Sequence, residues 1–185
     1  MRSAVFFDRD GVLNQLVERD AGLASPRSAA DFRLVPEAAD VVSRLRAAGL
    51  GIFVVTNQPD VARGHLSEAE LEEMHAQLRD RLAPDDIAVC PHDDRDRCLC
   101  RKPLPGMLYA LSSRWSVDLT ASVVVGDSWR DVEAGRRAGC RTVLLARPSL
   151  LPAPVPSGAT AIVETLNDAA EWVLRNATSG MELRL

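Results

Sequence analysis

Two acidic side chains, Asp8 and Asp10, follow the first apolar run of the chain, which covers residues 4–7. Alternate residues of an extended segment project to the same side, so we expect both carboxylates at one place. Carboxylates this close repel each other unless a cation lies between them. In such a pair one carboxylate can attack phosphorus, while the other protonates the leaving oxygen and later activates water. The pair alone is a weak signal, because aspartate is also common in turns and helix caps.

Three further segments place polar side chains near the ends of apolar runs or predicted helices. They contribute Thr56, Asn57 and Gln58 after residues 52–55, Asp127 after residues 123–126, and Lys102 just before a predicted helix. Asp131 follows Asp127 by one helical turn. Ligands of open α/β sheets bind at the carboxyl ends of the strands, so these side chains should converge. Lys102 is the only lysine among 22 basic residues, which suggests that a compact ammonium is needed there.

A divalent cation and a phosphate group both fit this set of side chains. Carboxylates from two strands can share a hard cation, and Mg²⁺ prefers one or two carboxylates together with waters and phosphate oxygens. A hydroxyl, an amide and an ammonium around that cation suit the three equatorial oxygens of a transferring phosphoryl group. Each segment taken alone also has an ordinary explanation as a polar turn or a helix cap. Their coincidence at several strand ends favours a site for phosphate esters.

The chain also holds a candidate zinc site. Cys90, His92, Cys98 and Cys100 lie within eleven residues in the spacing C-x-H-x5-C-x-C, whereas Cys140 lies alone in an apolar stretch. Three thiolates and an imidazole can close a tetrahedral Zn²⁺ site, and a set without an open position indicates a structural role. The alternative, cysteines that fill a core, suits the charged residues between them poorly. Because Lys102 follows the last ligand by two residues, this zinc loop, residues 90–100, could fix the position of the lysine.

Short apolar runs alternate with longer segments of helical period along most of the chain. The apolar runs are residues 4–7, 50–57, 86–90, 122–126 and 140–146, and the helical patterns are residues 36–49, 67–82, 104–115 and 129–139. This alternation predicts an α/β fold with a parallel sheet and helices on both faces. A last strand and helix are expected near residues 161–176, after a proline-rich surface connection at residues 148–160. In the second helical pattern, Ser67 and Glu70 have the spacing of a capping box, and His75 is expected to face solvent.

Length and charge limit the classes of protein to which this chain can belong. Its 185 residues fit one domain, which we place at residues 1–176 with a tail at residues 177–185. The net charge of -4 provides no broad positive field for nucleic acid or for a membrane surface. The chain shows neither an apolar run long enough for a membrane span nor a signal peptide. We therefore expect a cytoplasmic monomer whose partner is a small phosphate ester.

The four motifs resemble those of the haloacid dehalogenase-like phosphohydrolases. The chain carries FFDRDGVLN, VVTNQ, RKP and VVVGDSWRD in that order, and the resemblance covers residues 3–147. It implies that Asp8 is the nucleophile and that Asp10 is the general acid and base. The phosphate and substrate contacts are then Thr56, Asn57, Gln58 and Lys102, and the Mg²⁺ ligands are Asp8, the main-chain carbonyl of Asp10, and Asp127. The resemblance also implies a Rossmann-like core, of the nearly capless type because no long insertion is present.

The zinc loop resembles one branch of this family, which holds heptose bisphosphate phosphatases and histidinol-phosphate phosphatases. The stretches TNQPDVARG and RKPLPGML are similar to the heptose enzymes, which favours a heptose bisphosphate as the substrate. Arg101 is then a candidate contact for the second phosphate, the alternative being a solvated surface charge. Three departures touch expected substrate contacts. Pro59 and Asp60 replace Ser-Gly, Ser128 replaces a Lys or Arg, and RDAGLASP lacks the His-Gly-Tyr of the first substrate loop.

Three alternatives remain at this point: a histidinol-phosphate phosphatase, a catalytically silent zinc-stabilised binding module, and a phosphotransferase or phosphomutase. A silent module would be expected to lack at least one of Asp8, Asp10, Lys102 and Asp127, and all four are present. A nearly capless site is open to water, which favours hydrolysis over transfer.

Overall fold

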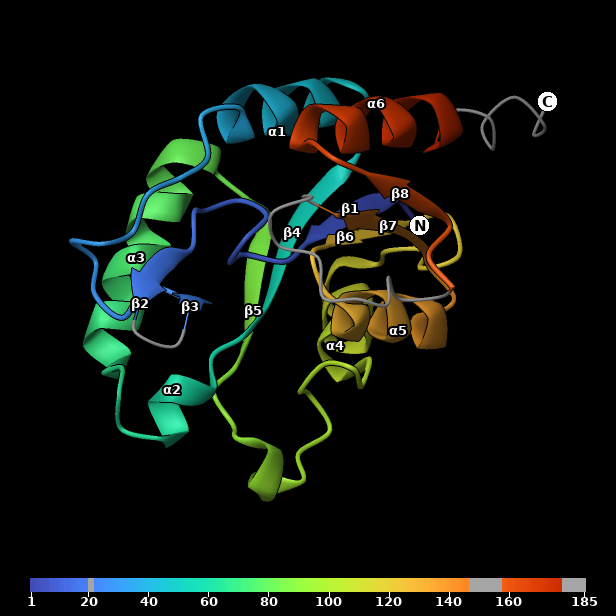
Figure 1. Ribbon diagram of the computed structural model, residues 1–185. Helices are drawn as coiled ribbons and strands as arrows, with labels where there is room; N and C mark the ends of the chain where they lie inside the picture. Colours follow the sequence, from blue (N-terminus) through green and yellow to red (C-terminus); the bar gives the residue numbers. More distant parts are fainter. Residues whose placement is uncertain (20–21, 147–157, 178–185) are drawn as a thin grey trace, which may run out of the picture.

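A six-stranded parallel sheet forms the centre of the computed structural model, which describes residues 1–19, 22–146 and 158–177 (Figure 1). The strands are β1 (Ala4–Phe7), β4 (Gly51–Asn57), β5 (Asp86–Cys90), β6 (Val123–Gly126), β7 (Arg141–Leu145) and β8 (Ala161–Val163). Their order in the sheet is β5-β4-β1-β6-β7-β8. Because β1 lies between β4 and β6, the three strands whose ends carry predicted site residues are neighbours. The predicted α/β fold is confirmed.

Helices cover both faces of the sheet, α1 and α6 on one side and α4 and α5 on the other (Figure 1). The helices are α1 (Ala38–Ala47), α3 (Glu68–Leu82), α4 (Gly106–Trp115), α5 (Trp129–Ala138) and α6 (Leu166–Ala177). Strand β1 shows how the sheet divides the core. Val5 and Phe7 pack into the cluster that contains residues of α1, α3 and α6, whereas Ala4 and Phe6 pack against α4 and α5. All four side chains are buried, since a central parallel strand is covered on both faces.

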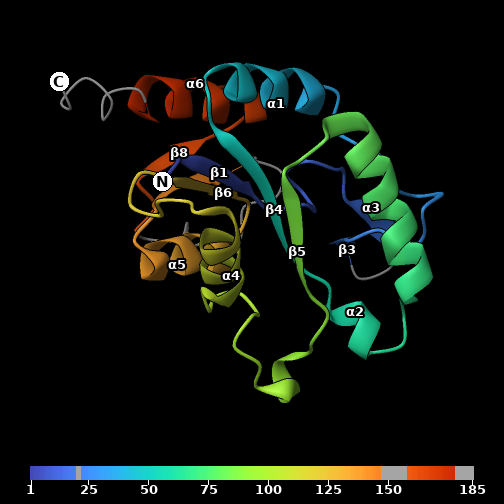
Figure 2. The same ribbon diagram turned by 180° about the vertical axis from the view of Figure 1, so that it is seen from behind.

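Short elements lie around the carboxyl ends of the strands, among them α2 (Pro59–Ala62) (Figure 2). Strands β2 (Val17–Arg19) and β3 (Gly22–Ala24) form an antiparallel hairpin that the sequence analysis did not predict. Each strand has three residues, too few to show a period of two. One turn of 3₁₀-helix, Asp94–Asp96, lies inside the zinc loop.

Helix α3 confirms one local expectation in part and contradicts another. Ser67 Oγ accepts a hydrogen bond from the Glu70 N–H (3.1 Å), as a helix cap should, but Glu70 Oε2 accepts from the Ala29 N–H (2.7 Å) and does not close the expected capping box. The expectation that His75 faces solvent is wrong, because only 3% of this residue is exposed. His75 lies four residues after Leu71 and three before Leu78, so it belongs to the buried stripe of the helix.

Part of the expected surface connection and most of the expected tail fall outside the described residues. Within the described part of the chain, none of the helices is long and apolar enough to cross a membrane.

Candidate active site

An open cavity of about 510 Å³ lies at the carboxyl ends of β1, β4 and β6. Its wall includes Asp8, Asp10, Asn57, Lys102 and Asp127. Four separate segments of sequence therefore meet, because parallel strands end at one edge of the sheet. Two other predicted contacts, Thr56 and Gln58, are each 1% exposed and do not line this cavity.

Lys102 lies between the carboxylates of Asp8 and Asp131 in the wall of this cavity. Its Nζ donates to Asp131 Oδ1 (2.5 Å) and to the Val55 carbonyl (2.8 Å), and it lies 2.9 Å from Asp8 Oδ1. The Lys102 side chain is 4% exposed and that of Asp131 is 1% exposed. These three acceptors match the three N–H donors of an ammonium, so the charge is fixed in place beside Asp8.

Asn57 holds the backbone of the same lysine. Its Nδ2 donates to the Lys102 carbonyl (3.0 Å), and its Oδ1 accepts from the Lys102 N–H (3.1 Å). The amide that was predicted to contact phosphate therefore also positions Lys102.

Three carboxylates lie close together around the single positive charge of Lys102. Oxygens of Asp8, Asp127 and Asp131 lie within 4.8 Å of one another. Burial, together with the charge of Asp131, raises the pKa of Asp8 well above its ordinary value and raises that of Asp127 to about 7. Burial alone would lower the pKa of Lys102, but Asp131 and Asp8 outweigh it and raise that pKa. With all three carboxylates ionised the group has an excess of two negative charges, which a divalent cation would balance.

Asp131 is a site residue to which the sequence analysis assigned no role. Its Oδ2 accepts from the Ser128 N–H (3.1 Å) and from Ser128 Oγ (2.5 Å), closing a capping box at the start of α5. Its Oδ1 is taken by Lys102. Both oxygens are therefore engaged, which leaves Asp8 and Asp127 as the carboxylates suited to a metal ion. The Ser-x-x-Asp spacing inside VVVGDSWRD was the available signal.

Two glycines allow these carboxylates to approach the backbone. Gly11 has a φ of +80°, and a Cβ at this position would collide with the Asp127 carboxylate. A Cβ at Gly126 would collide with the side chain of Asp131. Both positions need glycine because the acidic side chains occupy the space of a methyl group.

Asp10 has a cation of its own. Arg9 Nη2 lies 3.0 Å from each Asp10 oxygen, and Arg9 Nε donates to Oδ1 (3.1 Å). Asn14 donates to Oδ1 (3.0 Å), and Gln58 Nε2 donates to Oδ2 (2.7 Å) and to Thr56 Oγ1 (2.8 Å). Besides any metal ion that the two carboxylates share, each therefore has a cation from the protein: Asp8 pairs with Lys102 and Asp10 with Arg9.

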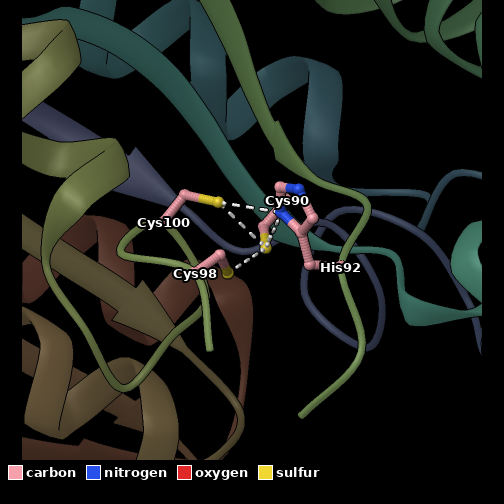
Figure 3. Close-up of side chains that lie close together, drawn as sticks. All are labelled: Cys90, His92, Cys98 and Cys100. Carbon is pink, nitrogen blue, oxygen red and sulfur yellow. Dashed lines mark hydrogen bonds between the residues drawn. The ribbon is translucent and has the colours of Figure 1, made fainter. Parts of the chain in front are cut away.

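The four predicted zinc ligands converge at one point (Figure 3). The Sγ atoms of Cys90 and Cys98 are 3.6 Å apart, and those of Cys90 and Cys100 are 3.2 Å apart. His92 Nδ1 lies 3.6 Å from Cys90 Sγ and 3.3 Å from Cys100 Sγ. Tetrahedral Zn²⁺ with ordinary bond lengths requires ligand separations of roughly 3.5 to 3.8 Å. The donor set therefore fits zinc with small adjustments.

The zinc loop also carries acidic residues that hold arginines at the cavity. Arg101 Nε lies 2.6 Å from Asp94 Oδ1, and Arg63 Nε lies 2.5 Å from Asp93 Oδ2. Both arginines line the cavity, as does Arg130, which has no ion-pair partner among the described residues and packs 5.0 Å from the centroid of the Trp129 ring. Arg101 is thus a cavity residue, with a side chain that is 12% exposed.

Two departures from the family pattern are close in space. Arg27, which follows the RDAGLASP stretch, lies with its Nε 2.6 Å from Asp60 Oδ2. Burial opposes ionisation of Asp60, but Arg27 and Arg63 outweigh it and lower the pKa of this carboxyl group. The altered loop and the altered start of α2 are therefore joined by an ion pair.

Comparisons with known proteins agree with this geometry. Residues 17–139 match the family model of haloacid dehalogenase-like hydrolases. The chain is 37% identical over 182 residues to the D-glycero-beta-D-manno-heptose-1,7-bisphosphate 7-phosphatase of Bordetella bronchiseptica, with 94% of this chain and 98% of the relative covered. The enzyme of the same name from Pseudomonas aeruginosa is also 37% identical, and the match covers 94% of this chain and 99% of that relative.

Two solved structures of heptose bisphosphate phosphatases are also similar to this chain. The D,D-heptose 1,7-bisphosphate phosphatase from B. bronchiseptica, complexed with magnesium and phosphate, matches with a TM-score of 0.81 and 35% identity, over 94% of this chain and 98% of that chain. The D,D-heptose 1,7-bisphosphate phosphatase from Burkholderia thailandensis matches with a TM-score of 0.66 and 26% identity, over 94% of this chain and 99% of that chain. The chain belongs to the haloacid dehalogenase-like hydrolases.

Proposed function

We propose that this protein is a Mg²⁺-dependent phosphatase that hydrolyses a sugar phosphate through an aspartyl-phosphate intermediate. The observation that carries the proposal is the grouping of Asp8, Asp127 and Lys102 in the wall of one polar cavity. Membership of a hydrolase family and the similarity to named phosphatases support it.

Asp8 is the nucleophile in this proposal. The Lys102 ammonium and the Arg9 main-chain N–H (2.7 Å) both bind Asp8 Oδ1 and fix the orientation of the carboxylate. Attack on phosphorus forms the bond to Asp8 and breaks the bond to the sugar oxygen, which takes a proton from Asp10. In the second step water attacks phosphorus, gives its proton to Asp10 and releases inorganic phosphate from Asp8. The charge of Lys102 stabilises the negative charge that spreads over the phosphoryl oxygens.

The carboxylates of Asp8 and Asp127, with the main-chain carbonyl of Asp10, would hold Mg²⁺. Oxygen donors of this kind are those that Mg²⁺ prefers, and the excess of two negative charges matches a divalent ion. Bound there, the ion would supply further charge to stabilise the transferring phosphoryl group.

Zn²⁺ would be held by Cys90, His92, Cys98 and Cys100 in a structural role. The closed set of four ligands supports this proposal, since it leaves no position open for a substrate. The loop that it closes carries Asp94, the partner of Arg101, and leads directly to Lys102. We therefore expect zinc to act on catalysis through the rigidity of this loop.

We propose D-glycero-D-manno-heptose 1,7-bisphosphate as the substrate, with hydrolysis at the 7-phosphate. A substrate with two phosphates needs a second group of cations away from Lys102, and Arg101 and Arg130 line the same cavity. Arg130 is the stronger candidate for this contact, because its charge has no ion-pair partner among the described residues, whereas Arg101 is already paired with Asp94. The names of the relatives support this substrate over histidinol phosphate.

The decisive experiment compares kcat/KM for heptose 1,7-bisphosphate, heptose 7-phosphate and histidinol phosphate in the presence of Mg²⁺. We expect the bisphosphate to be preferred over histidinol phosphate by about 100-fold, which corresponds to about 2.7 kcal/mol of transition-state binding. Asp8→Asn serves as the blank, and full activity of this variant would refute the proposal. Preference for histidinol phosphate would refute the substrate and leave the reaction intact.

The contact of Arg130 with the second phosphate can be tested with the heptose 1,7-bisphosphate and the heptose 7-phosphate. Arg130→Ala should raise KM for the bisphosphate at least about tenfold and leave KM for the 7-phosphate nearly unchanged. Arg95→Ala is the matched control, because Arg95 is an exposed arginine of the zinc loop that does not line the cavity. Equal effects of the two substitutions would contradict the assignment.

The remaining expectations also stand as proposals. We propose one domain over residues 1–176, a monomer, a cytoplasmic location, and neither a nucleic acid nor a membrane as partner. The net charge of -4 supports the last of these.

A further inference from the structure

The side chains of Arg9 and His75 are buried together next to the active site, and neither side chain has a role in the steps described above, in which Arg9 acts only through its main-chain N–H. Arg9 is 0% exposed and His75 is 3% exposed. They come from distant parts of the chain, since Arg9 follows β1 and His75 lies in the middle of α3. Arg9 Nη1 lies 3.1 Å from His75 Nε2.

The chemistry of arginine fixes the direction of this hydrogen bond. A guanidinium has donors and no acceptor, so Nη1 donates and His75 Nε2 must accept through its lone pair. His75 is therefore the neutral imidazole that carries its proton on Nδ1. Burial, followed by the charge of Arg9, lowers the pKa of His75 to about 4, which agrees with this geometry.

The rest of the guanidinium is directed at Asp10. Nε and Nη2 make three contacts with the two carboxylate oxygens, at 3.0 to 3.1 Å. The guanidinium carbon also lies 5.6 Å from the centroid of the buried Phe32 ring. A planar fork held by His75 at one corner and by Phe32 nearby has little freedom to turn, so it fixes the plane of the Asp10 carboxylate.

Burial of a complete arginine, an aspartate and a histidine is costly in free energy. Buried ion pairs rarely stabilise a fold more than apolar residues of the same volume would. A contribution to stability is therefore a weak explanation for this group. Asn14 and Gln58, also almost fully buried, add two further donors to Asp10. All of these bonds converge on the side chain that must transfer a proton.

We propose that Arg9 and His75 are positioning residues for Asp10: His75 of α3 orients the Arg9 guanidinium, and Arg9 holds the Asp10 carboxyl group where its protonated form can give a proton to the leaving oxygen. This inference rests on the proposed phosphatase mechanism. It makes α3, a helix that contributes no residue to the cavity wall, part of the catalytic apparatus.

A dependence on the leaving group separates positioning from a purely structural role. A sugar alcohol leaves poorly unless it is protonated, whereas p-nitrophenolate leaves readily without a proton. The value of kcat/KM includes only steps up to departure of the alcohol, so later hydrolysis of the aspartyl-phosphate does not enter. The ratio of kcat/KM for heptose 1,7-bisphosphate to that for p-nitrophenyl phosphate is also independent of the fraction of folded protein.

We expect His75→Leu, which removes the acceptor, to lower this ratio at least about tenfold. His75→Gln retains an acceptor oxygen for Arg9 and should restore the ratio to within about threefold of wild type. Arg9→Lys keeps the charge but not the fork, and should lower the ratio as His75→Leu does. Leu78→Val, a buried change one turn further along α3, is the control for general damage to the helix and should leave the ratio unchanged.

Two results would overturn the inference. The first is an unchanged ratio in His75→Leu and Arg9→Lys while wild type hydrolyses both substrates. The second is an unchanged ratio in Asp10→Asn, because the step through which the pair acts would then be absent. A wild-type protein that releases phosphate from neither substrate would refute the proposed function itself, and the inference with it.

Discussion

Replacing His75 with glutamine should flatten the acid side of the stability profile. His75 has a pKa of about 4 in the folded protein, compared with 6.5 for an ordinary histidine. The unfolded chain therefore binds a proton at this residue as the pH falls below 6.5, while the folded chain does not. A group whose folded pKa is lowered in this way favours unfolding at low pH, so stability is lost between pH 6.5 and pH 4.

The size of the effect follows from the two pKa values. Linkage gives a loss of about 2 kcal/mol between pH 7 and pH 5, and about 3 kcal/mol by pH 4. Glutamine cannot take up this proton, and it can still accept the hydrogen bond from Arg9. The free energy of unfolding of His75→Gln should therefore fall less steeply with acid than that of wild type, although both lose the contributions of other titrating groups.

The assay is urea unfolding of both proteins from pH 5 to pH 7.5, with Zn²⁺ and Mg²⁺ present throughout. The quantity of interest is the difference between the two free energies of unfolding at each pH, in which the metal sites and the shared carboxylates cancel. We expect this difference to change by about 2 kcal/mol over the range, in favour of the variant at low pH. Parallel profiles would show that His75 titrates alike in both states, and would refute the buried neutral imidazole.

Three further predictions concern the glycine beside Asp131, the zinc loop and the altered substrate loop. Gly126→Ala forces the added Cβ against Asp131, so kcat/KM should fall at least about tenfold and stability by about 1 to 3 kcal/mol, and wild-type values for both would contradict the packing. Cys98→Ser should lower the zinc content measured by metal analysis and reduce the Tm by at least about 5 °C, whereas unchanged zinc would exclude this ligand set. A double-mutant cycle of Arg27→Ala and Asp60→Ala should give a coupling of only about 0.5 kcal/mol, because the arginine is 37% exposed, and a value above about 1.5 kcal/mol would show a stronger link between the two loops.

Local patterns in the sequence were sufficient to predict the central sheet and the main helices. Residues 5–7 are Val-Phe-Phe and residues 123–125 are Val-Val-Val, uninterrupted β-branched or aromatic runs of the kind found in buried parallel strands. The hairpin of β2 and β3 was missed because three-residue strands carry no measurable period. His75 was misplaced because the nearby Glu72 and Glu73 suggest a polar face, whereas its distance of four residues from Leu71 puts it on the buried one.

The sequence by itself determined which residues come to the active site and to the zinc loop, because strand ends and ligand spacing are local properties of the chain. Asp8 and Asp127 follow from the first and the four zinc ligands from the second, while Lys102 was indicated by its place before a predicted helix and directly after the zinc loop. Only the tertiary structure decided which charge pairs with which. In the folded protein Lys102 pairs with Asp8 and Asp131, Arg9 pairs with Asp10, and His75 is buried against Arg9. Such pairs depend on how side chains from separate elements fill the same low-dielectric space, and no spacing along the chain encodes that.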